Sequence, residues 1–121
     1  MALSPDQIAH YRAGHEQRSH QHQQAKLQKQ QRGMQVARQA AQLLKSQWGA
    51  TQVVLFGSML DTTKVHADSD VDLAVWGLPE GDYYRALAEL LDIDPEFSID
   101  LIEVQLAKPS LLSVIQLGVE L

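Results

Sequence analysis

The strongest indication of how this chain folds is the segment Asp70-Val71-Asp72-Leu73-Ala74-Val75-Trp76. Its first residues alternate between polar and apolar and its last four are all apolar, which is typical of a central β-strand. Alternation places Asp70 and Asp72 on one face of that strand, roughly 6 to 7 Å apart along the backbone. Because a buried strand seldom begins with two acidic residues, we interpret this end of the strand as a candidate functional site.

Two further strands are predicted on either side of this one. Residues 52–56, Gln-Val-Val-Leu-Phe, form a short run with two β-branched members, and the run ends at a Gly57-Ser58 turn. Residues 98–104 form a third run, with Asp100 between apolar neighbours. A Gly-Ser turn and three carboxylates therefore lie at or inside three predicted strands. This coincidence is more specific than any one of the features alone.

Helices are predicted before and after the strands. Apolar residues recur at helical spacing over residues 34–48, and Gly49 follows as a stop signal. Residues 83–91 and 111–117 predict two shorter helices, the second of which is followed by Gly118. The order helix, strand, strand, helix, strand, helix predicts an α+β domain, similar to α/β proteins, in which helices pack on one face of a small mixed sheet.

The beginning of the chain has a different composition. We predict an N-terminal extension over residues 1–32 and a folded domain over residues 33–121. Residues 7–31 contain eight Gln and four His residues, and the spacing of the histidines does not place them on one helix face, which argues against a metal site there. Ser4 before Pro5 is a good helix start, so the extension fits a long exposed helix, and a disordered tail also fits its composition. We expect it to bind a partner or to oligomerise.

The composition excludes several classes of site. The 121 residues contain no Cys, so disulfides, thiolate zinc sites and cysteine nucleophiles are excluded. No run approaches about 18 apolar residues and the start does not resemble a leader, so we expect a cytoplasmic protein without a membrane segment. The net charge is −5, and the acidic residues concentrate after residue 32. This charge argues against direct nucleic-acid binding and favours a site that gathers divalent cations.

The close carboxylates predict a bound cation. Ionised Asp70 and Asp72 repel each other unless a positive charge lies between them. Mg²⁺ takes oxygen ligands at about 2.0 to 2.1 Å and commonly uses one or two carboxylates together with substrate phosphates. Asp100 as a third carboxylate would allow two metal ions roughly 3.5 to 4 Å apart, an arrangement suited to phosphoryl displacement. Gly57 permits close backbone approach and Ser58 offers a hydroxyl and an N–H group to phosphate oxygens.

These residues resemble a known signature. Leu55-Phe56-Gly57-Ser58 followed by Asp68-Ser69-Asp70-Val71-Asp72-Leu73-Ala74-Val75 is similar to the GS…DxD pattern of the DNA polymerase beta-like nucleotidyltransferases. The likeness spans residues 34–121 and implies the nucleotidyltransferase fold. Within that superfamily the short length, the strand with Asp100 and the ending over residues 114–121 resemble the minimal nucleotidyltransferases (MNT), which are the antitoxin partners of HEPN ribonuclease toxins.

The resemblance implies an enzyme that uses Mg²⁺ and ATP. It implies that Asp70, Asp72 and Asp100 form the catalytic metal site and that Asp100 also activates the acceptor hydroxyl. It implies that Gly57 and Ser58 bind the triphosphate. In that family the antitoxin transfers AMP from ATP to a tyrosine of the toxin and silences its ribonuclease, so the resemblance also implies a hetero-oligomer with a toxin.

Two departures from the family pattern bear on this prediction. The interval between the serine and the first aspartate is eleven residues, one more than is usual, and Met59-Leu60 stand where a basic residue commonly follows the serine. Neutralisation of phosphate would then fall to the metal ions or to Lys64 or Arg85. Two alternatives stay open: a non-catalytic binding module that neutralises the toxin by occlusion, and transfer to a small-molecule hydroxyl, which usually needs a second domain.

Overall fold

The computed structural model describes residues 4–121, with side chains described for residues 4–7 and 21–121. In chain order its elements are α1 (Pro5–Gln47), β1 (Gln52–Phe56), the 3-10 turn η1 (Ser58–Leu60), β2 (Val71–Trp76), α2 (Tyr83–Leu91), β3 (Ile99–Glu103), the 3-10 turn η2 (Val104–Leu106), α3 (Pro109–Gln116) and β4 (Val119–Glu120). The predicted bounds of β1 and α2 are confirmed. β2 and β3 each begin one residue later than predicted, and α3 begins two residues earlier.

The four strands form one mixed sheet in the order β3-β2-β1-β4. β2 pairs antiparallel with β1 and parallel with β3, so Asp72 lies between Phe56 on one neighbour and Asp100 on the other. The short strand β4 pairs antiparallel with β1. β4 was not predicted, because two residues are too few to show an alternating pattern. The α+β fold class with a small mixed sheet is confirmed.

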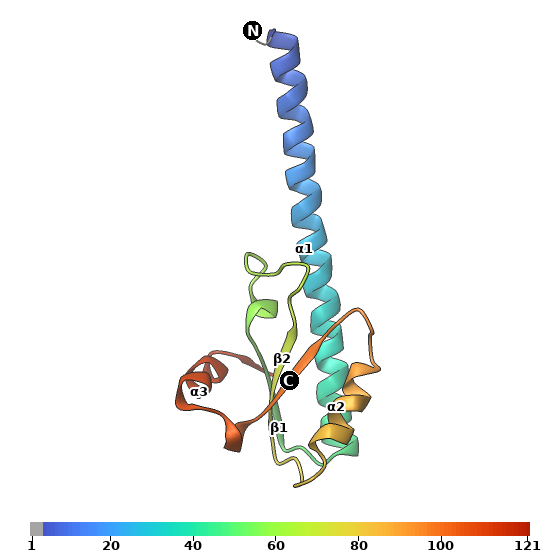
Figure 1. Ribbon diagram of the computed structural model, residues 1–121, viewed down its shortest axis with the longest axis vertical. Coiled ribbons are helices and arrows are strands. Elements are labelled where there is room, and N and C mark those ends of the chain that lie inside the picture. The colour runs from blue at the N-terminus through green and yellow to red at the C-terminus, as the bar shows by residue number, and fades with distance from the viewer. Residues whose placement is uncertain (1–3) are drawn as a thin grey trace.

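Both faces of the sheet are covered (Figure 1). α1 and α2 pack on the face formed by the alternate residues Val53, Leu55, Val71, Leu73, Val75, Ile99 and Leu101. α3 packs on the opposite face, where Ile115 contacts a cluster with Val54, Phe56 and Ala74. The prediction of helices on one face is therefore correct for α1 and α2 and wrong for α3. A strand that is apolar on both faces, as residues 73–76 are, needs a covering layer on each side.

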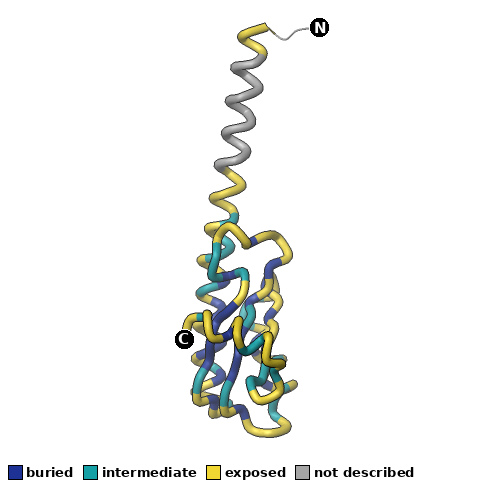
Figure 2. Tube along the Cα trace, turned by 90° about the vertical axis from the view of Figure 1, so that its left-hand side faces the viewer, coloured by how far each residue is buried: buried dark blue, intermediate teal, exposed yellow. Residues whose placement is uncertain are grey.

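α1 is a single helix of 43 residues. It starts with a capping box in which the Ser4 hydroxyl accepts from the Gln7 N–H at 3.2 Å and the Gln7 side chain accepts from the Ser4 N–H at 2.9 Å. The C-terminal part of α1 lies along the sheet and carries its buried residues, whereas the N-terminal part extends beyond the sheet (Figures 1 and 2). The side chains of His10, His15 and His20 lie outside the described residues.

α1 is the only described helix of membrane-spanning length, and its polar composition disqualifies it, so no helix within residues 4–121 could cross a bilayer. The expected boundary after residue 32 lies inside this helix.

Candidate active site

The turn after β1 lies directly against Asp72 of β2. Gly57 has a φ of 84°, a conformation that favours glycine, and Ser58 follows as the first residue of η1. A Cβ atom at Gly57 would lie 2.2 Å from Oδ2 of Asp72. Any side chain at this position would overlap the carboxylate, so both the backbone conformation and the contact require glycine.

Asp72 and Asp100 are paired across the parallel strands β2 and β3. Neighbouring strands lie about 4.8 Å apart, and residues in register point to the same face. That face is the one covered further along by α3, because Ala74 and Ile102 follow at the alternate positions and belong to the α3 cluster. Tertiary structure thus brings together two carboxylates that are 28 positions apart in the sequence.

Asp70 lies one residue before β2 and is exposed. The N–H of its neighbour Val71 donates to the carbonyl of Ser98 at 2.9 Å, which holds the first residues of β2 and β3 side by side. The structure therefore places Asp70, Asp72 and Asp100 at one end of the sheet, where β1 ends and β2 and β3 begin.

The electrostatics of this end of the sheet favour a cation. Burial, together with the negative charges of Asp100 and Asp70, raises the pKa of Asp72 from 3.8 to about 6; burial is the largest cause and Asp70 the smallest. Among the described residues, no ion pair involves any of the three aspartates. Residues 4–7 and 21–121 supply no countercharge in an ion pair with these carboxylates, so a cation bound between them would remove the repulsion.

The carboxylates do not form a closed metal cage. Among the described residues, no group of three or more His, Cys, Asp or Glu side chains is arranged to hold a metal ion by itself. An ion at this site would take further ligands from water and from a bound substrate. Mg²⁺ fits such an open set of oxygen donors, because it usually keeps several waters and combines one or two carboxylates with phosphate oxygens.

The loop that leads into the aspartates is held by its own polar contacts. Ser69 is buried, and its hydroxyl accepts from the N–H of His66 at 2.9 Å. Nδ1 of His66 accepts from the N–H of Asp68 at 3.2 Å. Asp61 accepts from the N–H and the hydroxyl of Thr63, which lowers the pKa of that carboxyl. His66, which the sequence did not single out for catalysis, serves to shape this loop.

The position after Ser58 cannot supply a cation to a phosphate. Met59 is fully buried and lies in the core with α1. Of the two basic residues considered as substitutes, Arg85 pairs with Asp82 and stacks over the Trp48 ring, on the α1 and α2 side of the sheet. Lys64 is exposed in the loop between the Gly-Ser turn and the aspartates.

A cavity of about 550 Å³ opens along β3, beginning at the residue that follows Asp100. The Tyr83 hydroxyl donates to the Leu101 carbonyl at 2.7 Å. Burial, followed by the charge of Asp100, raises the pKa of Tyr83, which shows that this ring lies near the third aspartate. Tyr84 and Leu106 in the lining are 81% and 75% exposed. The cavity was not predictable from the sequence, because residues of η2 and α3 complete its lining.

Comparison with known proteins gives one match. The family model described as "Polymerase beta, Nucleotidyltransferase" matches residues 38–121. This span contains the Gly-Ser turn, the three aspartates and the cavity. No curated protein and no solved structure matches the chain.

Proposed function

We propose that this chain, which belongs to the polymerase beta nucleotidyltransferase family, transfers AMP from ATP to a hydroxyl of a partner polypeptide. The observation that carries the proposal is the junction of three elements. Asp72 contacts the Gly57 turn on one side and is in register with Asp100 on the other. A nucleotidyl transfer needs a phosphate-binding turn and carboxylates at one point, and this junction supplies both.

The roles of the residues follow from their places. Gly57 leaves room for the Asp72 carboxylate directly beside the turn, and Ser58 offers its hydroxyl and N–H to phosphate oxygens. Asp70 and Asp72, with Asp100, would hold Mg²⁺. Bound Mg²⁺ would polarise the α-phosphate and neutralise the charge that develops on the leaving pyrophosphate.

Asp100 is exposed at the edge of the sheet, so it is the carboxylate to which an incoming acceptor has direct access. In the transfer step the acceptor hydroxyl loses its proton to Asp100, and its oxygen forms a bond to the α-phosphorus. The bond from the α-phosphorus to the bridging oxygen breaks, and pyrophosphate leaves with the electron pair.

The surface beside Asp100 supports a polypeptide acceptor. Tyr84 and Leu106 present exposed apolar area around the cavity on β3, and such area is typical of protein interaction sites. The resemblance to the minimal nucleotidyltransferases makes the acceptor more specific, namely a tyrosine of a HEPN ribonuclease toxin. The modified toxin would lose ribonuclease activity, and this protein would act as its antitoxin.

Occlusion without catalysis is the second candidate function. It is favoured by Met59, which stands where a basic residue commonly follows the serine. Because Met59 is apolar and buried, this position offers no positive charge to a phosphate. The two functions differ in their dependence on the aspartates, because occlusion does not need them.

The test combines the protein with a HEPN toxin encoded beside it, Mg²⁺ and each nucleoside triphosphate, followed by intact-mass analysis. Added mass in whole AMP units on the toxin, absent with Asp70→Asn plus Asp72→Asn, is the expected result. Neutralisation by the double variant as strong as by wild type would establish occlusion instead. Added mass only on small hydroxyl compounds would point to the small-molecule alternative.

A further inference from the structure

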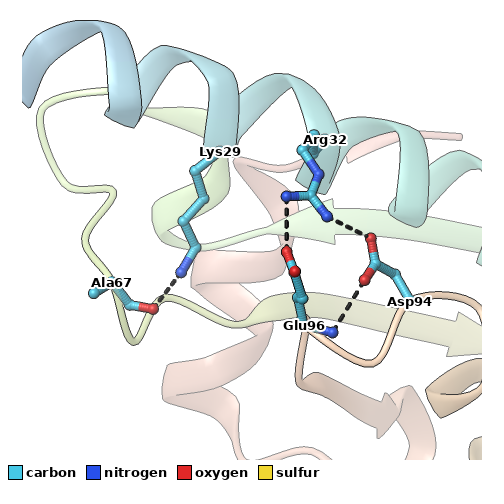
Figure 3. A network of polar contacts seen from close by, with 5 residues as sticks. All are labelled: Lys29, Arg32, Ala67, Asp94 and Glu96. Atoms are coloured by element: carbon cyan, nitrogen blue, oxygen red, sulfur yellow. Dashed lines mark hydrogen bonds and ion pairs between the residues drawn. The ribbon is translucent and has the colours of Figure 1, made fainter. Parts of the chain in front are cut away.

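One turn of α1, residues 29–33, contacts three segments: the turn that contains Ser58, the loop before Asp70 and the loop before the strand of Asp100. We call it the anchoring turn. It lies between the N-terminal part of α1 and the part that packs in the core. Figure 3 shows its contacts with two of the loops.

The first contact is with the turn that contains Ser58. Nε2 of Gln30 donates to the Met59 carbonyl at 3.1 Å. A Cβ atom at Gly33 would lie 2.5 Å from the sulfur of Met59, and Met59 is fully buried. The helix backbone therefore lies directly on the residue that follows Ser58, and a hydrogen bond sets the position of its carbonyl.

The second contact is with the loop before Asp70. Nζ of Lys29 donates to the Ala67 carbonyl (Figure 3). Ala67 lies inside the short turn that the buried Ser69 closes. Ala67 lies three residues before Asp70, so Lys29 holds the segment that leads directly to the first aspartate.

The third contact is with the loop before Asp100. Arg32 pairs with Asp94 at 3.0 Å and with Glu96 at 2.8 Å (Figure 3). The Arg32 guanidinium also lies 5.5 Å from the centre of the Phe97 ring, which is buried. Phe97 lies two residues before the start of β3, so Arg32 holds the segment that leads into the strand of Asp100.

We propose that the anchoring turn positions the phosphate-binding turn and the aspartates relative to one another; this inference rests on the proposed nucleotidyl transfer. Ion pairs between exposed side chains contribute little to stability. Here the ion pairs of Arg32 and the hydrogen bonds of Lys29 and Gln30 join one helical turn to three separate loops, each adjacent to a different part of the site. Small displacements of groups that must act together lower catalytic rates strongly, so the consequence of these contacts lies in geometry.

The role of each contact predicts a different kinetic signature. Gln30→Ala frees the turn of Ser58 and should raise the KM for ATP several-fold with little change in kcat. Arg32→Ala frees the segment before Asp100 and should lower kcat about tenfold with little change in KM for ATP. Arg32→Lys keeps one ion pair and should restore part of kcat. Arg38→Ala is the matched control, because Arg38 is exposed on the same helix and makes no ion pair within the described residues.

A second measurement does not depend on activity. Hydrogen exchange of the metal-free protein should show faster exchange at residues 57–61 in Gln30→Ala and at residues 94–100 in Arg32→Ala. Exchange in β1 should match wild type in both, and Arg38→Ala should change neither segment.

Two outcomes would overturn the inference: local exchange and kinetics equal to wild type, or a uniform rise of exchange throughout the domain. If the wild-type protein transfers no nucleotide, the proposed function fails, and the exchange comparison still decides whether the anchoring turn holds these loops.

Discussion

Oδ2 of Asp72 lies 2.2 Å from the point that a Cβ atom on Gly57 would occupy. The end of β1 and the start of β2 are thus very close together. The Asp72 carboxylate occupies the space that a side chain at position 57 would need. A backbone φ of 84° at Gly57 adds a second reason for glycine. This contact joins the proposed phosphate-binding turn to Asp72, which makes Gly57 the most direct target for mutation.

Gly57→Ala should remove ATP binding and nucleotidyl transfer, because the new methyl group displaces Asp72 and the backbone conformation is strained. Calorimetry with ATP and Mg²⁺ measures the loss. Gly81→Ala is the control, because Gly81 has a φ of 87° and no atom within 4 Å of an added Cβ. It should lower the free energy of unfolding by about 1 kcal/mol and leave binding unchanged. Equal ATP affinity in the two variants would contradict a role for the contact with Asp72.

The pKa of Asp72, about 6 against an ordinary value of 3.8, predicts how stability depends on pH without divalent cations. Between these values the folded protein holds a proton that the unfolded chain has released, so stability falls as pH rises. The stabilisation is fully present below about pH 4 and is lost as pH rises through 6. Because Asp72 is half exposed, the loss should be about 1 to 2 kcal/mol.

Urea unfolding of wild type and of Asp72→Asn across this pH range isolates the contribution. The asparagine variant should lack this part of the decline and should be the more stable protein at neutral pH. Parallel curves for the two proteins would show that the Asp72 carboxyl is not destabilised by its surroundings.

Mg²⁺ should stabilise the wild-type protein at neutral pH, because a cation between Asp70, Asp72 and Asp100 removes their repulsion. A rise in Tm of about 2 to 5 °C at saturating Mg²⁺, reversed by a chelator, is expected. Asp72→Asn should show little of this rise. Asp68→Asn is the control, because this exposed carboxylate of the same loop should not be needed for the rise in Tm. An equal loss of the rise in both variants would locate the ion elsewhere.

Gly33→Ala should destabilise the protein, although the same substitution in an exposed helix interior stabilises by about 1 kcal/mol. The added Cβ would lie 2.5 Å from the Met59 sulfur, and because Met59 is fully buried, any shift of its side chain must displace other core residues. Overpacking of this kind costs about 1 to 3 kcal/mol. Met59→Ala in the same chain should relieve the clash, so a double-mutant cycle should give a coupling energy of at least about 1 kcal/mol. Additive effects would exclude the contact.

Leu106→Asp should weaken binding of the polypeptide acceptor about tenfold or more, because it places a charge in the apolar lining of the cavity beside Asp100. ATP affinity should be unchanged. Leu117→Asp is the matched control, because Leu117 is a comparably exposed leucine, 84% against 75%, outside that lining. Titration calorimetry with the purified partner compares the two, and a greater loss with Leu117→Asp would place the docking surface at the C-terminal end of α3, outside the cavity.

Much of the local structure follows from short-range patterns. Residues 52–56 and 83–91 each show one hydrophobic pattern along their length, and each run is bounded by glycine or polar residues. The observed β1 and α2 have the predicted bounds. The capping residues Ser4 and Gly49 also lie where the pattern placed them. Such signals depend on the backbone preferences of a few neighbouring residues, so they are visible without the fold.

Other features depend on contacts between distant segments. The sequence predicted helices on one face of the sheet, whereas α3 covers the second face through the contacts of Ile115 with Val54, Phe56 and Ala74. In the sequence Met59 was only a departure from the family pattern, where a basic residue commonly follows the serine, whereas the structure shows that it is a core residue under Gly33. The anchoring turn was missed because its residues have the composition of a solvated surface helix.

The chain's own pattern was enough to identify a Gly-Ser turn and three aspartates on strands, since strand alternation is a property of the local backbone. Only the tertiary structure decided that Asp72 is in register with Asp100 and in contact with Gly57. Register between parallel strands is set by the crossover that joins them and by packing on α1 and α2. Those interactions arise between residues far apart in sequence, and no short segment of the chain encodes them.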